Sequence, residues 1–431
     1  MKRLFRLGLA LVAAALLTGT ATAQLPGGLG GNVGGVLGNA VGDVRQTTGN
    51  IAGNTLEAVR STRLDQLRLL RRQHPDLVET DRAGNAFLRN EVLAIAPSDA
   101  ALAAARARGF TIARTIDGGD LGVPVIVLRA PANLSTQRAL DTLRTLDPGG
   151  AYDLDHLYVP SGETTSQPRA SAPSSATVSG VRVGLIDSGV DARHPAFAQA
   201  HIEQSGFAGP QALADVHGTE VASLMVGSGV VRGGSPGASL YVADVYGGAP
   251  VGGGAASIVA AFAWLARERV AVVNVSLVGP QNRALEAAVR AMIARGCIVV
   301  AAVGNDGPNA PPLYPASYPG VVGVTGVDAR NRALPEAARG AQVRFAAPGA
   351  DMGAAAPGGR VIGVRGTSFA APLVAGLLAQ EMARPGASPA SALSALTGRA
   401  VDLGARGADP VYGAGLVGGD LRTAPQRVAR E

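Results

Sequence analysis

Five apolar runs from residue 181 onward most strongly limit what this chain can fold into. They lie at 181–186, 238–243, 270–275, 297–302 and 321–326. Helix-like runs lie between several of them, for instance 255–268 and 281–295. Continuous apolar strands that alternate with helices are typical of a parallel sheet covered by helices on both faces. We therefore predict an α/β domain over residues 181–420.

A second pattern precedes this domain, over residues 91–160. Four strand-like runs lie at 91–96, 110–116, 123–128 and 151–159, and two helices begin after the capping residues Ser98 and Ser135. The order β-α-β-β-α-β is that of a ferredoxin-like unit. The segment holds no obvious active-site constellation of its own. It predicts a small α+β domain that precedes the α/β domain.

The first 23 residues have the three parts of an export signal. Lys2, Arg3 and Arg6 form a positive region, residues 7–17 form a short apolar region, and Ala21-Thr22-Ala23 has the form of a cleavage site. The apolar region is shorter than the ~20 residues that a spanning helix needs, which disfavours an uncleaved membrane anchor. We expect a signal peptide over 1–23, export to the periplasm or the medium, and no membrane span after its removal.

The segments between these units have the composition of connectors. Residues 24–54 are Gly-rich and predict a flexible segment. Residues 55–90 form a helical region that begins after the N-cap candidate Asn54, with its helix ending before Pro75. Residues 161–180 are rich in Ser, Pro, Thr and Ala, which indicates an exposed linker open to proteolysis. Residues 421–431 form a C-terminal tail.

Charge and cysteine content exclude several classes of protein. The formal net charge is +6, and Lys2, Arg3 and Arg6 of the expected signal supply three of those charges. No dense basic stripe or nucleic-acid-binding motif remains, so we expect no nucleic-acid partner. The single Cys297 rules out an internal disulfide framework and a Cys-based zinc cage. No H-E-x-x-H motif occurs, so no catalytic metal is expected.

Four residues of the α/β domain supply the parts of a nucleophilic site. Asp187 and Asn305 follow apolar strands, whereas His217 and Ser368 open helix-like runs. A serine hydroxyl needs an imidazole to accept its proton, and the imidazole needs a carboxylate to hold its tautomer. The oxyanion that forms needs N–H donors, one of which an Asn side chain can supply. The chain order Asp…His…Ser differs from that of the α/β-hydrolases, and no G-x-S-x-G elbow occurs.

Several segments together resemble one known family, the subtilisin-like serine proteases or subtilases. The matching segments are Val183-Gly-Leu-Ile-Asp-Ser-Gly-Val190, His217-Gly-Thr-Glu-Val-Ala222, Val273-Asn-Val-Ser-Leu277, Ala301-Ala-Val-Gly-Asn305 and Gly366-Thr-Ser-Phe-Ala-Ala-Pro372. They follow the order of the family across most of residues 181–420. The resemblance implies a serine endopeptidase with a subtilisin-like fold.

The resemblance also implies roles for individual residues. Asp187 orients the base, His217 is the base and later the acid, Ser368 is the nucleophile, and Asn305 lines the oxyanion hole. The implied substrate-binding residues are Ser276, Leu277, Val278, Gly279, Ala302 and Gly304. Val278 stands where the family usually has Gly, so we expect a narrowed pocket that prefers a medium-sized apolar residue before the cut.

By the same resemblance, residues 91–160 are similar in element order to the propeptide domain of subtilases. Such domains assist folding and inhibit the protease from within the same chain. Self-cleavage is then expected between about Tyr158 and Gly180. The chemistry needs no cofactor. Structural calcium, which some subtilases bind through scattered loop ligands, stays open because no D-x-[DN]-x-[DN]-G loop marks it.

Three functions of different classes remain. The first is an exported serine endopeptidase made as a proenzyme, with proteins and peptides as substrates and its own propeptide as inhibitor. The second is a catalytically silent subtilase that serves as a binding or scaffold protein. The third is an exported surface-attachment protein that acts through the Gly-rich residues 24–54.

Overall fold

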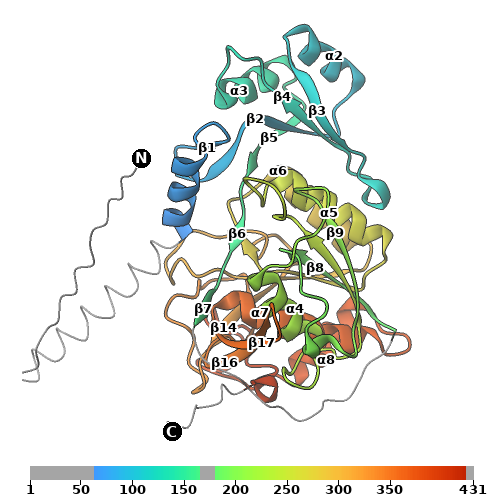
Figure 1. Cartoon of the computed structure of the whole chain (residues 1–431), viewed down its shortest axis with the longest axis vertical. Helices are drawn as coiled ribbons and strands as arrows, with labels where there is room; N and C mark the ends of the chain where they lie inside the picture. The colour runs from blue at the N-terminus through green and yellow to red at the C-terminus, as the bar shows by residue number, and fades with distance from the viewer. Residues whose placement is uncertain (1–62, 166–179, 424–431) are drawn as a thin grey trace, which may run out of the picture. The chain divides into compact units, whose positions relative to one another are not determined.

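A computed structural model describes residues 63–165 and 180–423 (Figure 1). The chain divides into two units, Met1–Ala52 and Gly53–Glu431, and every described residue belongs to the second. The expected signal peptide and Gly-rich segment, most of the linker and the end of the tail lie outside the described residues.

A seven-stranded sheet forms the centre of residues 180–423, which we call the large domain. Its strands in spatial order are β15 (Val343–Pro348), β14 (Val322–Val327), β13 (Ile298–Ala302), β11 (Val272–Val275), β8 (Arg182–Asp187), β10 (Ser239–Asp244) and β9 (His201–Gly206). Every neighbouring pair is parallel, which confirms the predicted fold class. The five predicted runs form the five inner strands. The two edge strands, β9 and β15, were not predicted.

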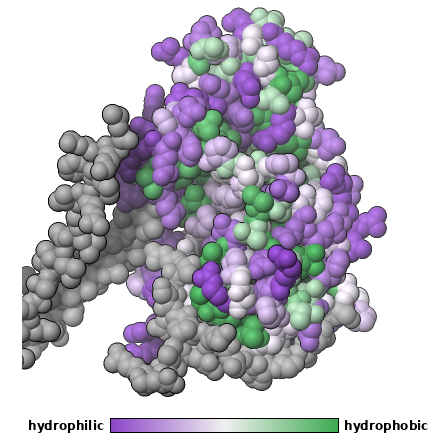
Figure 2. All heavy atoms as spheres, viewed as in Figure 1, coloured by the Kyte–Doolittle hydropathy of each residue, from purple (hydrophilic) through white to green (hydrophobic). Residues whose placement is uncertain are grey.

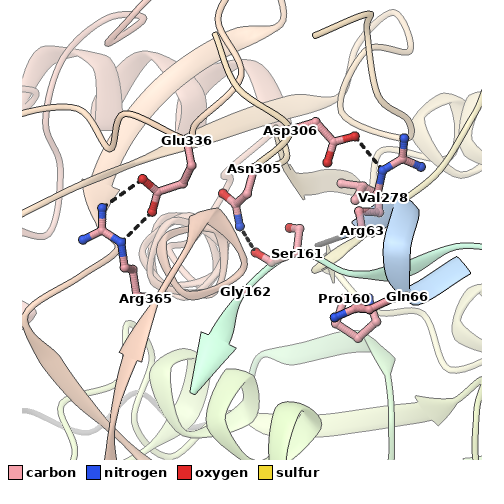
Figure 3. A pocket seen from close by; sticks show the side chains of 10 residues that line it. All are labelled: Arg63, Gln66, Pro160, Ser161, Gly162, Val278, Asn305, Asp306, Glu336 and Arg365. Carbon is pink, nitrogen blue, oxygen red and sulfur yellow. Dashed lines mark hydrogen bonds and ion pairs between the residues drawn. The ribbon is translucent and has the colours of Figure 1, made fainter. Parts of the chain in front are cut away.

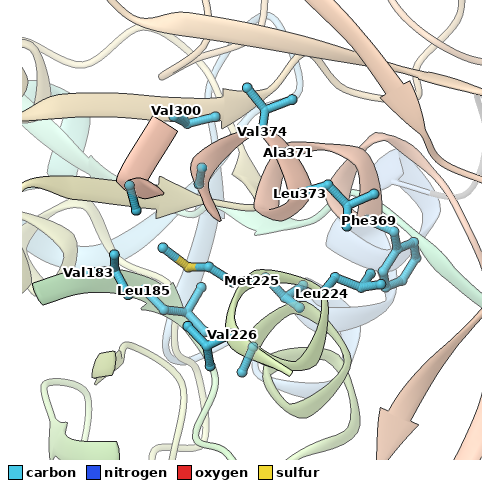
Figure 4. Packing of buried hydrophobic residues seen from close by; sticks show 14 of the residues in the cluster. Val183, Leu185, Leu224, Met225, Val226, Val300, Phe369, Ala371, Leu373 and Val374 are labelled. Atoms are coloured by element: carbon cyan, nitrogen blue, oxygen red, sulfur yellow. The ribbon is translucent and has the colours of Figure 1, made fainter. Parts of the chain in front are cut away.

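Helices cover both faces of this sheet. The helices on one face are α4 (Val216–Val226) and α7 (Thr367–Met382), and those on the other are α5 (Ala255–Arg267) and α6 (Arg283–Ala294). Figure 4 shows the first layer, in which Leu185 of β8 lies near Met225 of α4. The next residue, Ile186, packs into the opposite layer because successive strand side chains point to opposite faces. Each inner strand therefore reads as a continuous apolar run.

Residues 78–156, which we call the small domain, form an antiparallel sheet with two helices. Its elements along the chain are β1 (Val78–Thr80), β2 (Ala86–Ile95), α2 (Asp99–Ala107), β3 (Thr111–Ile116), β4 (Val125–Arg129), α3 (Thr136–Leu146) and β5 (Ala151–His156). From β2 to β5 the order is β-α-β-β-α-β. The Ser98 and Ser135 side chains accept hydrogen bonds from the first turns of α2 and α3.

The described part of residues 55–90 contains a helix that ends before Pro75, as the sequence predicts, and two stretches of strand that the sequence does not predict. Among the described residues of that range only 63–73 are helical, and β1 and the first residues of β2 follow. β2 starts at Ala86 because its first residues pair with both β1 and the end of β5, a long-range pairing that local sequence does not reveal.

Strand β2 of the small sheet is buried on both of its faces. Val92 and Ala94 of β2 pack with the α2 and α3 layer, whereas Leu93 packs with residues of α5 and α6 from the large domain. The small sheet therefore lies on the helical face of the large domain (Figure 1). Hydrophilic residues cover most of the molecular face in Figure 2, with apolar residues in small groups between them.

Two carboxylates of β5 lie at the starts of these same helices. Asp155 Oδ1 accepts the Ala256 N–H of α5, whose N-cap Gly254 makes no side-chain cap bond. Asp153 Oδ2 accepts the Arg283 N–H of α6. Carboxylates at helix N-termini satisfy free N–H groups and interact favourably with the helix dipole. The small domain thus supplies polar contacts to the large domain as well as apolar area.

The remaining strands are short and border the carboxyl edge of the large sheet. β6 (Val159–Pro160) pairs antiparallel with β12 (Leu277–Val278), and β7 (Glu163–Thr165) pairs antiparallel with β17 (Arg360–Arg365). β16 (Met352–Ala356) completes the second group, and the other elements are α8 (Pro389–Gly398), η1 (Gly119–Leu121), η2 (Pro195–Phe197) and η3 (Gly419–Leu421). Residues 159–165, which include the predicted start of the linker, therefore run along the large domain as paired strand.

Asp155 is buried in an environment that disfavours its charged form. Burial, and then the nearby charge of Glu91, raise the pKa of Asp155 to about 7, although the Ala256 N–H, Arg114 and His156 act in the opposite direction. An undocked aspartic acid has an ordinary pKa of 3.8. Between these two values the docked carboxyl holds a proton that the undocked one has released, so docking weakens as the pH rises through this window and levels off above it.

We expect Asp155→Asn to remove this pH dependence. The amide oxygen can still accept the Ala256 N–H but does not titrate. Both the variant and its parent carry Ser368→Ala. The melting temperature of the Asp155→Asn chain minus that of the parent should increase from pH 4 to pH 7 and stay constant above pH 7. Asp65→Asn, at an exposed carboxylate, serves as the control. A difference in melting temperature between the Asp155→Asn chain and its parent that does not change with pH would contradict the assignment.

Candidate active site

Asp187 and His217 meet at the carboxyl edge of the large sheet. Asp187 is the last residue of β8 and is fully buried, and His217 is the second residue of α4. His217 Nδ1 lies 2.8 Å from Asp187 Oδ1 and 3.1 Å from Oδ2. The Ser188 N–H donates to Asp187 Oδ1 and holds the carboxylate in place. This arrangement fixes the proton on Nδ1 and leaves Nε2 as the basic nitrogen of the imidazole.

The carboxylate also changes the basicity of the imidazole. Burial alone would lower the pKa of His217, but the charge and hydrogen bond of Asp187 outweigh it and raise the pKa above its usual value. His217 Nε2 is buried and has no hydrogen-bond partner among the described residues. His217 Nε2 can therefore accept a proton from a nucleophile at this edge of the sheet.

Ser368 is the second residue of α7 and lies in the same cleft. Gly366 precedes the helix with φ 139°, a conformation that favours glycine, and a Cβ there would lie 2.8 Å from Asn305 Nδ2. The Ser368 hydroxyl donates to Ser276 O at 2.9 Å. Within the described part of the chain it makes no hydrogen bond to His217. The nucleophile candidate is therefore turned away from its base in this conformation.

The backbone carbonyl of Ser161 lies in the oxyanion pocket. Asn305 Nδ2 donates to Ser161 O at 2.5 Å, and the Ser368 N–H donates to the same oxygen at 3.1 Å (Figure 3). The Thr367 N–H donates to Asn305 Oδ1 at 3.2 Å, which orients the amide so that its nitrogen faces Ser161. Two donors on one carbonyl oxygen are the arrangement that stabilises a tetrahedral intermediate.

The chain on either side of Ser161 lies in the cleft as an added strand. Upstream, β6 pairs with β12, and the Tyr158 N–H donates to Gly253 O at 2.8 Å. Downstream, β7 pairs with β17. Strand addition to an exposed edge is a common way to bind an extended peptide. The Ser161–Gly162 peptide bond therefore lies between the two added strands, with its carbonyl oxygen bound by Asn305 and the Ser368 N–H.

The predicted substrate-binding residues separate into two groups. Ser276, Leu277, Val278 and Gly279 lie along the chain segment that contains Tyr158 to Ser161. The Gly304 N–H donates to Thr367 Oγ1 in the same cleft, whereas the Ala302 side chain packs in the apolar core. Ala302 is the last residue of β13, the strand that leads to Asn305.

Sequence reasoning missed two ion pairs that border the oxyanion pocket (Figure 3). Arg365 of β17 contacts Glu336 with Nε–Oε1 2.7 Å and Nη2–Oε2 2.9 Å. Arg63 Nε of the helix over 63–73 lies 2.6 Å from Asp306 Oδ2, next to Asn305. The partners lie 29 and 243 residues apart, so no local pattern in the sequence links them.

Within residues 63–165 and 180–423, no helix combines the length and apolar character needed to cross a bilayer. The same residues contain no group of three or more His, Cys, Asp or Glu side chains suited to a metal ion. Cys297 is buried beside β13, where burial raises the pKa of its thiol and keeps it in the neutral form.

A parallel α/β sheet with Asp, His and Ser at its carboxyl edge and an Asn-based oxyanion pocket defines a serine protease with a subtilisin-like fold. Comparison with known proteins agrees, because a profile described as "Subtilase family" matches residues 178–415. The chain belongs to the subtilase family.

Relatives and a solved structure support this membership. Subtilisin E of Bacillus subtilis is 31% identical over 285 residues, which are 61% of this chain and 72% of the relative. Subtilisin Savinase of Lederbergia lenta is 33% identical over 272 residues, 62% of this chain and 98% of the relative. Fervidolysin of Fervidobacterium pennivorans, a keratinolytic enzyme related to subtilisin, shares the fold with a TM-score of 0.67 at 20% identity. That match covers 80% of this chain and spans 62% of the fervidolysin chain.

We expect Asn305→Ala to slow cleavage of the Ser161–Gly162 bond by ~10²–10³ while the chain still folds, because one oxyanion donor is lost. The rate is followed by intact mass after refolding from denaturant. Gln342→Ala, a surface amide whose side chain bonds only to the Arg339 carbonyl, is the control and should leave the rate unchanged. An Asn305→Ala chain that cuts at the normal rate would exclude this role for Asn305.

Proposed function

We propose that this chain is the proenzyme of an exported serine endopeptidase that first cuts its own Ser161–Gly162 bond. The observation that carries the proposal is the Ser161 carbonyl, which accepts hydrogen bonds from Asn305 Nδ2 and the Ser368 N–H. Membership of the subtilase family supports peptide bonds as the substrate class. The proposed cut falls within the range Tyr158 to Gly180 expected from the sequence.

The proposed reaction begins with rotation of the Ser368 side chain from Ser276 O towards His217 Nε2. His217 then accepts the hydroxyl proton while Oγ attacks the Ser161 carbonyl carbon, and Asn305 and the Ser368 N–H bind the oxyanion. The intermediate expels the Gly162 nitrogen, which takes the proton from His217. Water, again activated by His217, hydrolyses the resulting ester. Asp187 stabilises the imidazolium in both steps.

The same contacts explain why the small domain would act as an inhibitor after the cut. The residues that end at Ser161 keep their pairing with β12, and the small sheet keeps its apolar and helix-start contacts with α5 and α6. The Arg63–Asp306 pair, with side chains 12% and 10% exposed, adds a contact beside Asn305. Breaking a buried ion pair by removing one partner costs about 3–5 kcal/mol, so this contact matters for docking.

Export is the part of the proposal that rests on sequence. The signal-like residues 1–23 lie outside the described residues, and their pattern supports release into the periplasm or the medium. Proteins and peptides are the proposed substrates, and the reaction as written needs no cofactor. Calcium as a structural ion stays open.

A catalytically silent subtilase is the second candidate, and one observation favours it. The Ser368 hydroxyl donates to Ser276 O and makes no hydrogen bond to His217 within the described residues. In a silent protein this conformation would be permanent. In a proenzyme it is one rotamer, and a single side-chain rotation completes the site.

Intact mass of the refolded chain separates these candidates. We expect the wild-type chain to split into two fragments, the second with Gly162 as its N-terminus, and Ser368→Ala to stay whole. The control is Ser388→Ala, which replaces an exposed serine that caps α8. This variant should split like wild type.

Two results would contradict the proposal. If wild type stays whole and Ser368 takes no fluorophosphonate, the chain is a silent subtilase. If Ser368→Ala splits as well, another protease makes the cut.

A further inference from the structure

We propose that this protease cuts between two small residues, with glycine after the cut, and takes much of its selectivity from a tyrosine four residues before the cut. This inference rests on the proposed function and names its substrate class. Three independent contacts of residues 158–162 carry it: the pocket beside Ser161, the space around Gly162 and the burial of Tyr158.

Val278 lines the cavity that borders Ser161, and Leu313 packs beside Val278 over the backbone of Gly304, next to Asn305. Val278 and Leu313 are 1% and 4% exposed. A Cβ built on Gly304 would lie 2.5 Å from Leu313 Cδ1 and 3.6 Å from Val278 Cγ1, so both side chains pack over the Gly304 backbone. The Gly279 and Tyr314 backbones exchange two hydrogen bonds of 3.0 Å, which hold the two segments together. This bridge fixes the backbone next to Leu313.

Ser161 fits this shallow pocket because its side chain is short. Its hydroxyl lies 2.9 Å from Ser368 Oγ and 3.4 Å from Thr367 Oγ1, at the mouth of the pocket. Glycine, alanine and serine need no further space. A leucine or phenylalanine would have to displace Leu313 or Val278. From Val278 alone, the sequence predicts a pocket that accepts a medium-sized apolar residue. With Leu313 beside Val278, the pocket is smaller than that prediction.

The residue after the cut has still less room. A Cβ on Gly162 would lie 2.5 Å from Phe369 Cε2, and Phe369 is fully buried. On its other side, a Cβ on Gly366 would lie 2.7 Å from the Gly162 Cα, so the two backbones are in close contact. Phe369 thus selects glycine at this position by steric exclusion.

Tyr158 makes a large buried contact with the cleft, which the small residues Ser161 and Gly162 cannot make. It is fully buried, and a Cβ on Gly279 would lie 2.5 Å from its ring, so the glycine makes the space that the ring occupies. Its hydroxyl donates to Pro280 O at 2.6 Å, and its carbonyl accepts the Tyr246 hydroxyl at 2.8 Å. A site that hydrogen-bonds a substrate hydroxyl discriminates against the analogue that lacks it.

Substitutions in the full-length chain test the pocket during self-cleavage. After refolding from denaturant, Ser161→Ala should cut about as fast as wild type, and Ser161→Phe should cut ~10–200-fold more slowly. Adding Leu313→Gly to Ser161→Phe should restore at least a tenth of the rate of Leu313→Gly alone, because it reopens the pocket. The rate of Leu313→Gly with Ser161 kept is the reference for this rescue, because damage to the cleft lowers both rates and leaves their ratio unchanged. A Ser161→Phe chain that cuts at the wild-type rate, or a slow one that Leu313→Gly does not rescue, overturns the inference.

Peptides added to the self-processed protein test the other two contacts, and their kcat/KM values are compared at one fixed protein concentration because the bound N-terminal fragment competes equally with every peptide. The reference peptide is Tyr-Val-Pro-Ser-Gly-Glu-Thr-Thr, the sequence of residues 158–165. Leucine in place of its glycine, or alanine in place of its tyrosine, should each lower kcat/KM at least tenfold, with phenylalanine intermediate between tyrosine and alanine. Equal kcat/KM values across the series would overturn the inference.

The outcomes separate this inference from the proposed function. A wild-type chain that neither cuts itself nor reacts with a fluorophosphonate refutes both. A second outcome is a chain that cuts itself at Ser161–Gly162 and hydrolyses the reference peptide equally well when phenylalanine replaces its serine. This outcome keeps the proposed function and refutes only the inference.

Discussion

The hydrogen bonds that Asn305 and the Ser368 N–H make to the Ser161 carbonyl are the interaction on which the rest of the structure depends. They place one peptide bond of the chain beside the nucleophile. The two short strand pairings, β6 with β12 and β7 with β17, hold that bond from both sides. The donors that would stabilise the developing charge during reaction already bind a neutral carbonyl, so the site is preorganised before any chemistry occurs.

The small domain makes this arrangement durable because it binds surfaces that do not take part in the reaction. Its sheet packs against α5 and α6, and Asp155 and Asp153 accept N–H groups at the starts of those helices. Gly254 offers α5 no side-chain cap, so α5 depends on the small domain for this bond. The large domain without the small domain would lose both apolar burial and a helix cap.

The sequence predicted those parts of the structure that local patterns determine. The inner strands are apolar on both faces and form long runs. The site residues stand at the end of a strand, shortly beyond one or at a helix start: Asp187, Asn305, His217 and Ser368. The edge strand β9 reads His-Ile-Glu-Gln-Ser-Gly, and β16 reads Met-Gly-Ala-Ala-Ala, so neither shows strand periodicity. Ser161 lies in a segment of linker composition, and Leu313 packs on a glycine nine residues before it. Contacts of this kind depend on the folded backbone and leave no local signal.

The pairing of Ser161 and Gly162 with a cleft that the same chain builds has an evolutionary consequence. If the chain processes itself as proposed, every descendant of this sequence must accept its own residues 158–162 before it meets any other protein. A replacement that widens the pocket at Leu313 is tolerated at once, whereas a larger residue at position 161 survives only if the pocket has widened first. Changes at these positions should therefore arise in a fixed historical order, in which the pocket widens before residue 161 becomes larger.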